Sequence, residues 1–120
     1  MLNLAHKKLD VWKKSLILVA VVYKLTQSFP RDEQFGLTSQ IRRASVSVIS
    51  NIAEGFARNS ELETKRFLEI ARSSLVEVDT QIEIALKLNY LNEKNIIDLA
   101  ESSNHIFAML TKLIKKLLKV

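Results

Sequence analysis

One uncharged helical segment sets the packing problem that the rest of the chain has to solve. Residues 36–58 read GLTSQIRRASVSVISNIAEGFAR, and no charged side chain lies between Arg43 and Glu54. One apolar stripe at helical spacing comprises Leu37, Ile41, Ala44, Val48, Ile52 and Phe56. A second stripe on another side comprises Val46, Ile49, Ala53 and Ala57. A helix that is apolar on two sides must be covered on two sides, so we expect the second stripe to face another subunit.

Length and composition favour one all-α domain. The chain has 120 residues, is 48% hydrophobic and contains only two Gly and one Pro, so its turns must be few and its helices long. The absence of Cys excludes disulfides and thiolate metal sites and fits a reducing compartment. The first ten residues lack the apolar core of a signal peptide, and the apolar run at 15–23 is too short to span a membrane. We therefore expect a cytoplasmic protein without membrane association.

Apolar periodicity and local punctuation predict a single up-down-up-down antiparallel four-helix bundle spanning 1–120. The predicted helices cover about residues 9–27, 36–58, 61–88 and 93–118. Ser60 and Glu63 form a capping-box pattern before the third helix, Asn89 suits the left-handed residue that ends it, and Asn92 suits the N-cap of the fourth. Short connections favour antiparallel neighbours. The core-facing positions are expected to include Leu16, Tyr23, Ile70, Leu88 and Phe107.

No residue pattern indicates catalysis, so the sequence predicts a non-enzyme without metal or cofactor. His105 follows Glu101 by four residues, whereas the di-iron sites of helical bundles use paired Glu-x-x-His motifs. No general base is placed near a Ser, and no Gly-rich loop is present to cradle phosphate.

The small and polar residues of the second helix are expected to serve packing and assembly. Asn51 and Glu54 should share a side of the helix and join a hydrogen-bond network that fixes register or a subunit contact. Gly55 is expected to cap or loosen the last turn. The full assembly set is Val46, Ile49, Asn51, Ala53, Glu54 and Gly55.

The remaining functional signal is basic. The net charge is +5, with the excess in residues 1–58 and near the C-terminus, while residues 59–111 are acidic overall. Arginine suits phosphate because its planar guanidinium makes paired hydrogen bonds. The candidate nucleic-acid-binding residues are Arg42, Arg43, Arg58, Lys65, Arg66 and Arg72. These residues would allow salt-sensitive binding to the backbone of RNA or DNA without sequence-specific readout, and an ordinary solvated surface is the other interpretation of this charge. The apolar surplus of residues 36–58 leaves open an alternative, an oligomeric scaffold whose main ligand is another protein.

Several motifs resemble a known family. Residues 36–44 read GLTSQIRRA, residues 50–55 read SNIAEG and residues 66–71 read RFLEIA. Together they resemble the four-helix bundle proteins encoded within intervening sequences of bacterial 23S rRNA genes, also called the S23 ribosomal protein family. The resemblance implies an up-down bundle that assembles into homo-pentamers. Ile49 stands where proline is usual in the family, so we expect a less kinked second helix.

A related group sharpens the expectation about partners. The accessory proteins of diversity-generating retroelements are basic, pentameric and bind nucleic acid and a reverse transcriptase. The resemblance therefore implies RNA or DNA as a partner of this chain. Ser73 and Asn89 replace glycines that are common in the family, and both changes are expected to be tolerated.

Overall fold

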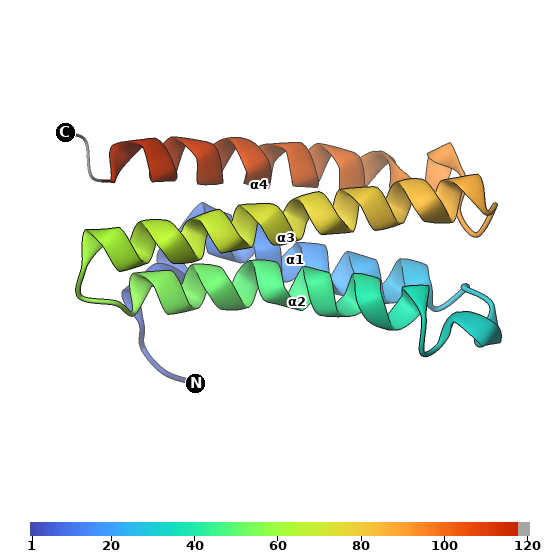
Figure 1. Ribbon diagram of the computed structural model, residues 1–120, viewed down its shortest axis with the longest axis horizontal. Helices are drawn as coiled ribbons and strands as arrows, with labels where there is room; N and C mark the ends of the chain where they lie inside the picture. The colour runs from blue at the N-terminus through green and yellow to red at the C-terminus, as the bar shows by residue number, and fades with distance from the viewer. Residues whose placement is uncertain (118–120) are drawn as a thin grey trace.

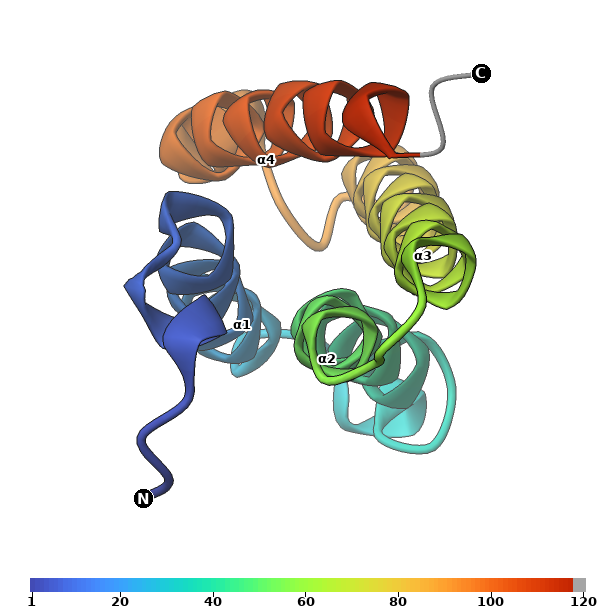
Figure 2. The same ribbon diagram turned by 90° about the vertical axis from the view of Figure 1, so that its left-hand side faces the viewer.

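Four long helices run alternately up and down in the computed structural model, which describes residues 1–117 (Figure 1). The helices are α1 (Asp10–Thr26), α2 (Leu37–Phe56), α3 (Glu61–Lys87) and α4 (Ile97–Lys116). Viewed along the bundle, they follow one another around the core, and each packs against its two neighbours (Figure 2). The predicted all-α, up-down-up-down bundle is confirmed.

The turns around α3 follow the predicted local chemistry. The Ser60 hydroxyl accepts a hydrogen bond from the Glu63 amide at 3.4 Å, which satisfies one of the free amides of the first turn. At the other end, Asn89 has φ 62°, the left-handed conformation that closes a helix. The backbone amide of Tyr90 then donates to the Ala85 carbonyl at 2.9 Å. The predicted ends of this helix therefore agree with the structure to within one residue.

The start of α4 differs from the prediction. Asn92 and Asn95 form a reciprocal capping box, but the turn that they open, η3 (Glu93–Ile96), is a 3-10 turn. The α-helix itself begins at Ile97, four residues later than predicted. An N-cap pattern specifies where helical turns begin but not whether the first turn is 3-10 or α, because the cap side chain can accept from the amide three residues on in either case. The predicted helix end at residue 118 lies outside the described residues.

The first stripe of α2 forms the centre of the core. Leu37, Ile41, Ala44, Val48 and Ile52 are buried, and Phe56 packs against them partly buried. The other helices contribute fully buried side chains, which include Leu18 and Val22 from α1, Leu68 and Val78 from α3, and Ile106 and Leu110 from α4. The core thus draws on all four helices.

Five apolar residues that were expected to face the core are instead exposed. Leu16, Tyr23, Ile70, Leu88 and Phe107 are between 40% and 50% exposed. They lie beside the buried stripes rather than within them, because a bundle covers only part of each helix circumference. The bundle consequently leaves more apolar surface open than its periodicity predicts.

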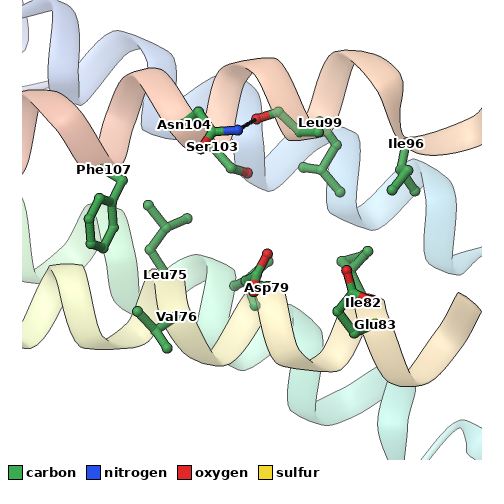
Figure 3. A pocket seen from close by; sticks show the side chains of 12 residues that line it. Leu75, Val76, Asp79, Ile82, Glu83, Ile96, Leu99, Ser103, Asn104 and Phe107 are labelled. Atoms are coloured by element: carbon green, nitrogen blue, oxygen red, sulfur yellow. Dashed lines mark hydrogen bonds between the residues drawn. The ribbon is translucent and has the colours of Figure 1, made fainter. Parts of the chain in front are cut away.

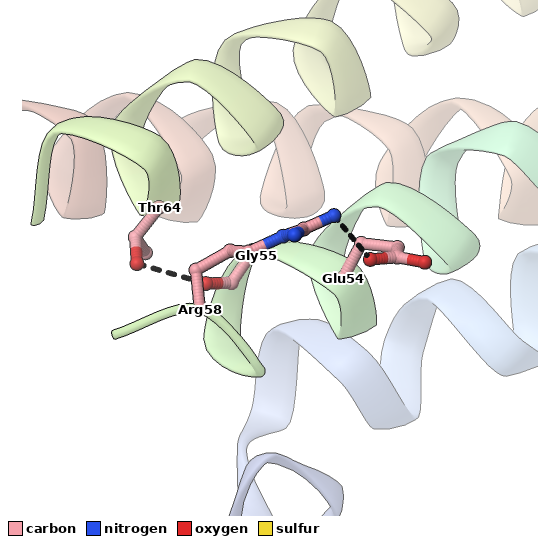
Figure 4. A network of polar contacts seen from close by, with 4 residues as sticks. All are labelled: Glu54, Gly55, Arg58 and Thr64. Carbon is pink, nitrogen blue, oxygen red and sulfur yellow. Dashed lines mark hydrogen bonds and ion pairs between the residues drawn. The ribbon is translucent and has the colours of Figure 1, made fainter. Parts of the chain in front are cut away.

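The α2–α3 pair makes the most extensive contact between helices, and small residues allow it. Gly55 is a buried helical residue without positive φ, so the expectation that it caps the helix is wrong. A Cβ atom built on it would lie 3.1 Å from the Phe67 Cβ and 3.3 Å from the Thr64 carbonyl oxygen. The Thr64 hydroxyl donates to the Gly55 carbonyl at 2.8 Å (Figure 4). Gly55 therefore serves close helix approach.

A polar contact joins the two loops at the opposite end of the bundle. The Tyr90 hydroxyl donates to the Glu33 carboxylate at 2.8 Å, and its ring lies 5.5 Å from the Phe29 ring. The hydrogen bond to Glu33 is the main reason that the pKa of Tyr90 is raised above its ordinary value. A raised pKa means that this contact stabilises the fold while the phenol is protonated and is lost as pH rises through the raised pKa.

Candidate nucleic-acid interface

The bundle has one basic end. The start of α1, the turn between α2 and α3, and the end of α4 lie together on the left of Figure 1. Residues 1–19, 50–70 and 105–117, which form that half, contain ten Lys and Arg against five Asp and Glu, whereas the other described residues contain seven against eight. The ten cations of the basic end are Lys7, Lys8, Lys13, Lys14, Arg58, Lys65, Arg66, Lys112, Lys115 and Lys116. All are exposed or half-buried, so their charges face solvent.

Three of the six predicted phosphate-binding residues, Arg58, Lys65 and Arg66, lie at this end. Arg58 makes an ion pair of 3.1 Å with Glu54 (Figure 4). Its guanidinium also lies 4.8 Å from the centre of the Phe67 ring. Both partners of the ion pair are about half exposed, so the pair contributes little to stability and can open toward a ligand. No second ion pair is formed within residues 1–117. The positive charges of the other cations at this end are therefore not neutralised by a paired carboxylate.

Arg42 joins two helices and does not lie at the basic end. Its Nε donates to the Thr26 hydroxyl at 2.8 Å, and its Nη2 lies 3.3 Å from the Tyr23 carbonyl oxygen. The guanidinium also stacks 4.6 Å from the centre of the Tyr23 ring. These groups belong to the last turn of α1, where carbonyls lack helical partners and a positive charge is favoured. Arg42 therefore holds α2 against the end of α1.

We expect Arg42→Met to destabilise the fold by about 1–2 kcal/mol, because it removes charged hydrogen bonds from a half-buried site. It should leave the affinity for RNA within about twofold of wild type, because one cation away from the interface contributes little screened field. Urea unfolding and filter binding measure the two quantities. Arg43→Met, at the adjacent exposed position, is the matched control and should not alter stability. A large loss of RNA affinity with unchanged stability in Arg42→Met would contradict this role.

Of the other two predicted residues, Arg72 borders the basic end, since both of its contacts come from residues 105–117, and Arg43 lies away from it. Arg72 Nη1 donates to the Thr111 hydroxyl at 3.2 Å, and its guanidinium lies 5.8 Å from the Phe107 ring centre, so it joins α3 to α4. Arg43 is exposed on the middle of α2. The structure thus brings three predicted cations together with seven lysines from residues 7–14 and 112–116, which the candidate set drawn from the sequence did not include.

The polar residues of α2 have different roles. Asn51 Nδ2 donates to the Ser47 carbonyl at 2.8 Å and to the Ser47 hydroxyl at 3.0 Å. The hydroxyls of Ser47 and Ser74 share a hydrogen bond of 2.8 Å, so this network links α2 to α3 within one chain. Glu54, by contrast, points to solvent and pairs with Arg58. The expected common network of Asn51 and Glu54 is therefore not formed.

The second stripe of α2 remains partly open in the single chain. Val46 is 39% exposed, Ile49 and Ala53 are half-buried, and Ala57 is exposed. These residues adjoin α1, since Arg42 on the same side of α2 reaches Tyr23. One bundle therefore does not cover this stripe.

The side chains that could bind a metal ion are dispersed. Within residues 1–117, no three His, Asp or Glu side chains lie close enough together to hold a metal ion. His6 is buried beside Trp12, with ring centres 6.0 Å apart, and His105 is exposed. Nor does any helix of the described chain combine the length and apolar character needed to cross a bilayer.

These features define a class of small all-α proteins, up-down four-helix bundles with one basic end. The model of the 23S rRNA-intervening sequence protein family matches residues 7–112, and the chain belongs to that family. The family assignment that the sequence motifs predicted is thereby confirmed.

A solved structure shares the fold. It is a crystal structure at 1.70 Å of a protein of unknown function from the S23 ribosomal protein family of Bacteroides thetaiotaomicron VPI-5482. The two chains are 24% identical, with a TM-score of 0.78 over 88% of this chain and 98% of the other. At that identity the likeness shows the fold alone. Comparison with curated proteins finds no match.

Proposed function

We propose that this protein is a non-catalytic homo-oligomeric bundle that binds RNA or DNA through its basic end. The observation that carries the proposal is that three segments far apart in sequence place ten exposed or half-buried cations on one end of the bundle. Such a surface attracts the phosphate backbone, and binding releases condensed counterions. The far end, with slightly more acidic than basic residues, would orient the bundle on the polyanion.

The proposed binding is directed at the backbone and does not read bases. Sequence readout requires side chains that reach base edges or aromatic rings that stack on bases. Three aromatic residues at this end, Trp12, Phe56 and Phe67, are partly buried, and the Arg58 guanidinium covers Phe67. The fourth, Phe107, is 42% exposed, but it lies at the α3–α4 contact beside the Arg72 guanidinium. The lysines that dominate the surface are mobile point charges suited to phosphate.

The open apolar residues support the oligomeric part of the proposal. On α1, Leu16 is 50% exposed and Ile17 is 58% exposed, and on α2 Val46 is 39% exposed. Apolar side chains that are exposed next to one another, as Leu16 and Ile17 are, form the kind of contiguous patch that marks a protein contact. The same surface supports the second candidate function, a scaffold whose main ligand is another protein.

Measurements on the purified protein test both candidate functions, nucleic-acid binding and the protein scaffold. We expect the purified protein to be larger than one chain by light scattering and to bind a structured RNA in filter assays, with log Kobs falling linearly as log salt rises. A slope of about −3 or steeper would correspond to several phosphate contacts. Absence of RNA and DNA retention at low salt would refute nucleic-acid binding. A defined protein partner that stays bound after nuclease treatment would favour the scaffold.

A further inference from the structure

α1 carries an apolar ridge that points away from the core. Leu16 and Ile17 are 50% and 58% exposed, and Ala20 on the next turn is also exposed. Lys13 and Lys24 lie one turn before and one turn after these three residues. The spacing places all five on one helix face, which we call the α1 ridge. The ridge is therefore an apolar strip with a positive charge at each end.

A groove lies between α3 and α4 on a different side of the bundle (Figure 3). Its volume is about 330 Å³, and Leu75, Ile82 and Leu99 line its apolar floor. Val76 and Phe107 form its lip and are 50% and 42% exposed. Two carboxylates, those of Asp79 and Glu83, lie along its α3 side. This α3–α4 groove is thus apolar within and negative at one edge.

We propose that the α1 ridge of one copy docks in the α3–α4 groove of a second copy. The proposal rests on the oligomeric part of the proposed function and specifies the surfaces that meet. Charge complementarity favours this occupant, because Lys24, at the end of the ridge away from the basic end, can oppose Asp79 and Glu83, which lie one helical turn apart at the edge of the groove. The lengths are also compatible: the apolar part of the ridge, from Leu16 to Ala20, spans four residue steps, about 6 Å, and the α3 wall of the groove, from Leu75 to Glu83, spans eight, about 12 Å.

The ridge and the groove cannot meet within one chain. α1 lies diagonally across the bundle from α3 (Figure 2). The exposed side chains of the ridge face away from the core. The contact therefore joins two unlike surfaces, so each copy both supplies a ridge and accepts one. Such a contact repeats from copy to copy until it closes, and a copy that lacks one surface should end the chain of contacts.

This property gives a complementation test. Ile17→Asp places a carboxylate on the ridge, and Val76→Asp places one at the groove lip, where either would be desolvated against apolar side chains. We expect each variant alone to be monomeric by analytical ultracentrifugation under conditions in which the wild-type protein is oligomeric. An equimolar mixture should form a particle of two chains, because one variant retains its groove and the other its ridge.

The controls separate the possible outcomes. Leu62→Asp, at a 63% exposed position remote from both surfaces, should keep the wild-type particle size. All variants should keep the wild-type circular dichroism. Oligomers that survive Ile17→Asp and Val76→Asp would overturn the assignment of the ridge and the groove as the contact surfaces, but not the proposed oligomer itself. A mixture of the two variants that stays monomeric would overturn the same assignment. A wild-type protein that is monomeric throughout would overturn the proposed oligomer as well, while the RNA-binding assay is read independently.

Discussion

Replacing Arg66, Lys112 and Lys115 together with glutamine is expected to lower the affinity for structured RNA about 100-fold or more near 0.1 M salt. The three residues come from α3 and α4, are exposed, and lie at the basic end. Each phosphate contact contributes about 0.7–0.9 to the slope of log Kobs against log salt, so losing three should flatten the slope by about two to three. Filter binding over a salt series measures both quantities.

The matched control removes the same charge from the other end. Arg31, Lys87 and Lys94 are exposed at the far end, and their replacement by glutamine lowers the net charge equally. We expect that triple variant to lose no more than about threefold in affinity, because charges beyond a Debye length of about 10 Å are largely screened. If both triple variants weaken binding to the same extent, the interaction follows net charge and the basic end is not a specific interface.

Periodicity predicted three of the four helices to within one or two residues at each end, because the spacing of apolar side chains is a local property. The buried stripe of α2 was likewise apparent from sequence, since no other face of 36–58 holds six apolar residues at helical spacing. The exposure of Leu16 and Phe107 was not apparent. Both lie at the margins of an apolar arc, and which margin is covered depends on the position of the neighbouring helix.

The candidate interface could be predicted only in part. Arg58, Lys65 and Arg66 adjoin one predicted turn, so their proximity follows from the sequence. The lysines of 7–14 and 112–116 join them only through the up-down topology, which returns both ends of the described chain to the same end of the bundle. The role of Arg42 depends on hydrogen-bond acceptors in α1, at Tyr23 and Thr26. Whether Arg42 can reach them depends on the relative axial positions of α1 and α2. The apolar periodicity of each helix does not predict this axial offset.

The second large effect is expected at Gly55. Gly55→Ala should destabilise the fold by about 1 kcal/mol and Gly55→Val by about 3 kcal/mol, because a side chain there overpacks the α2–α3 contact. The backbone at Gly55 is already helical, so the higher helix propensity of alanine offsets about 1 kcal/mol of the overpacking cost. The values given above are the net changes in the free energy of unfolding. The opposing atoms are the Thr64 carbonyl oxygen and the Phe67 Cβ, which cannot rotate away as the end of a flexible side chain could. Urea unfolding followed at 222 nm measures both values.

Ser50 provides the matched control, since it is an exposed residue of the same helix. Ser50→Ala should be neutral or slightly stabilising, and Ser50→Val should cost only the few tenths of a kcal/mol that a β-branched residue loses in a helix. The difference between Val at 55 and Val at 50 therefore isolates the helix contact from propensity. Equal destabilisation at the two positions would show that the contact between α2 and α3 accommodates a side chain at position 55 without a loss of stability. A large difference would identify the close approach at Gly55, with the Thr64 hydrogen bond beside it, as a principal stabilising contact between α2 and α3.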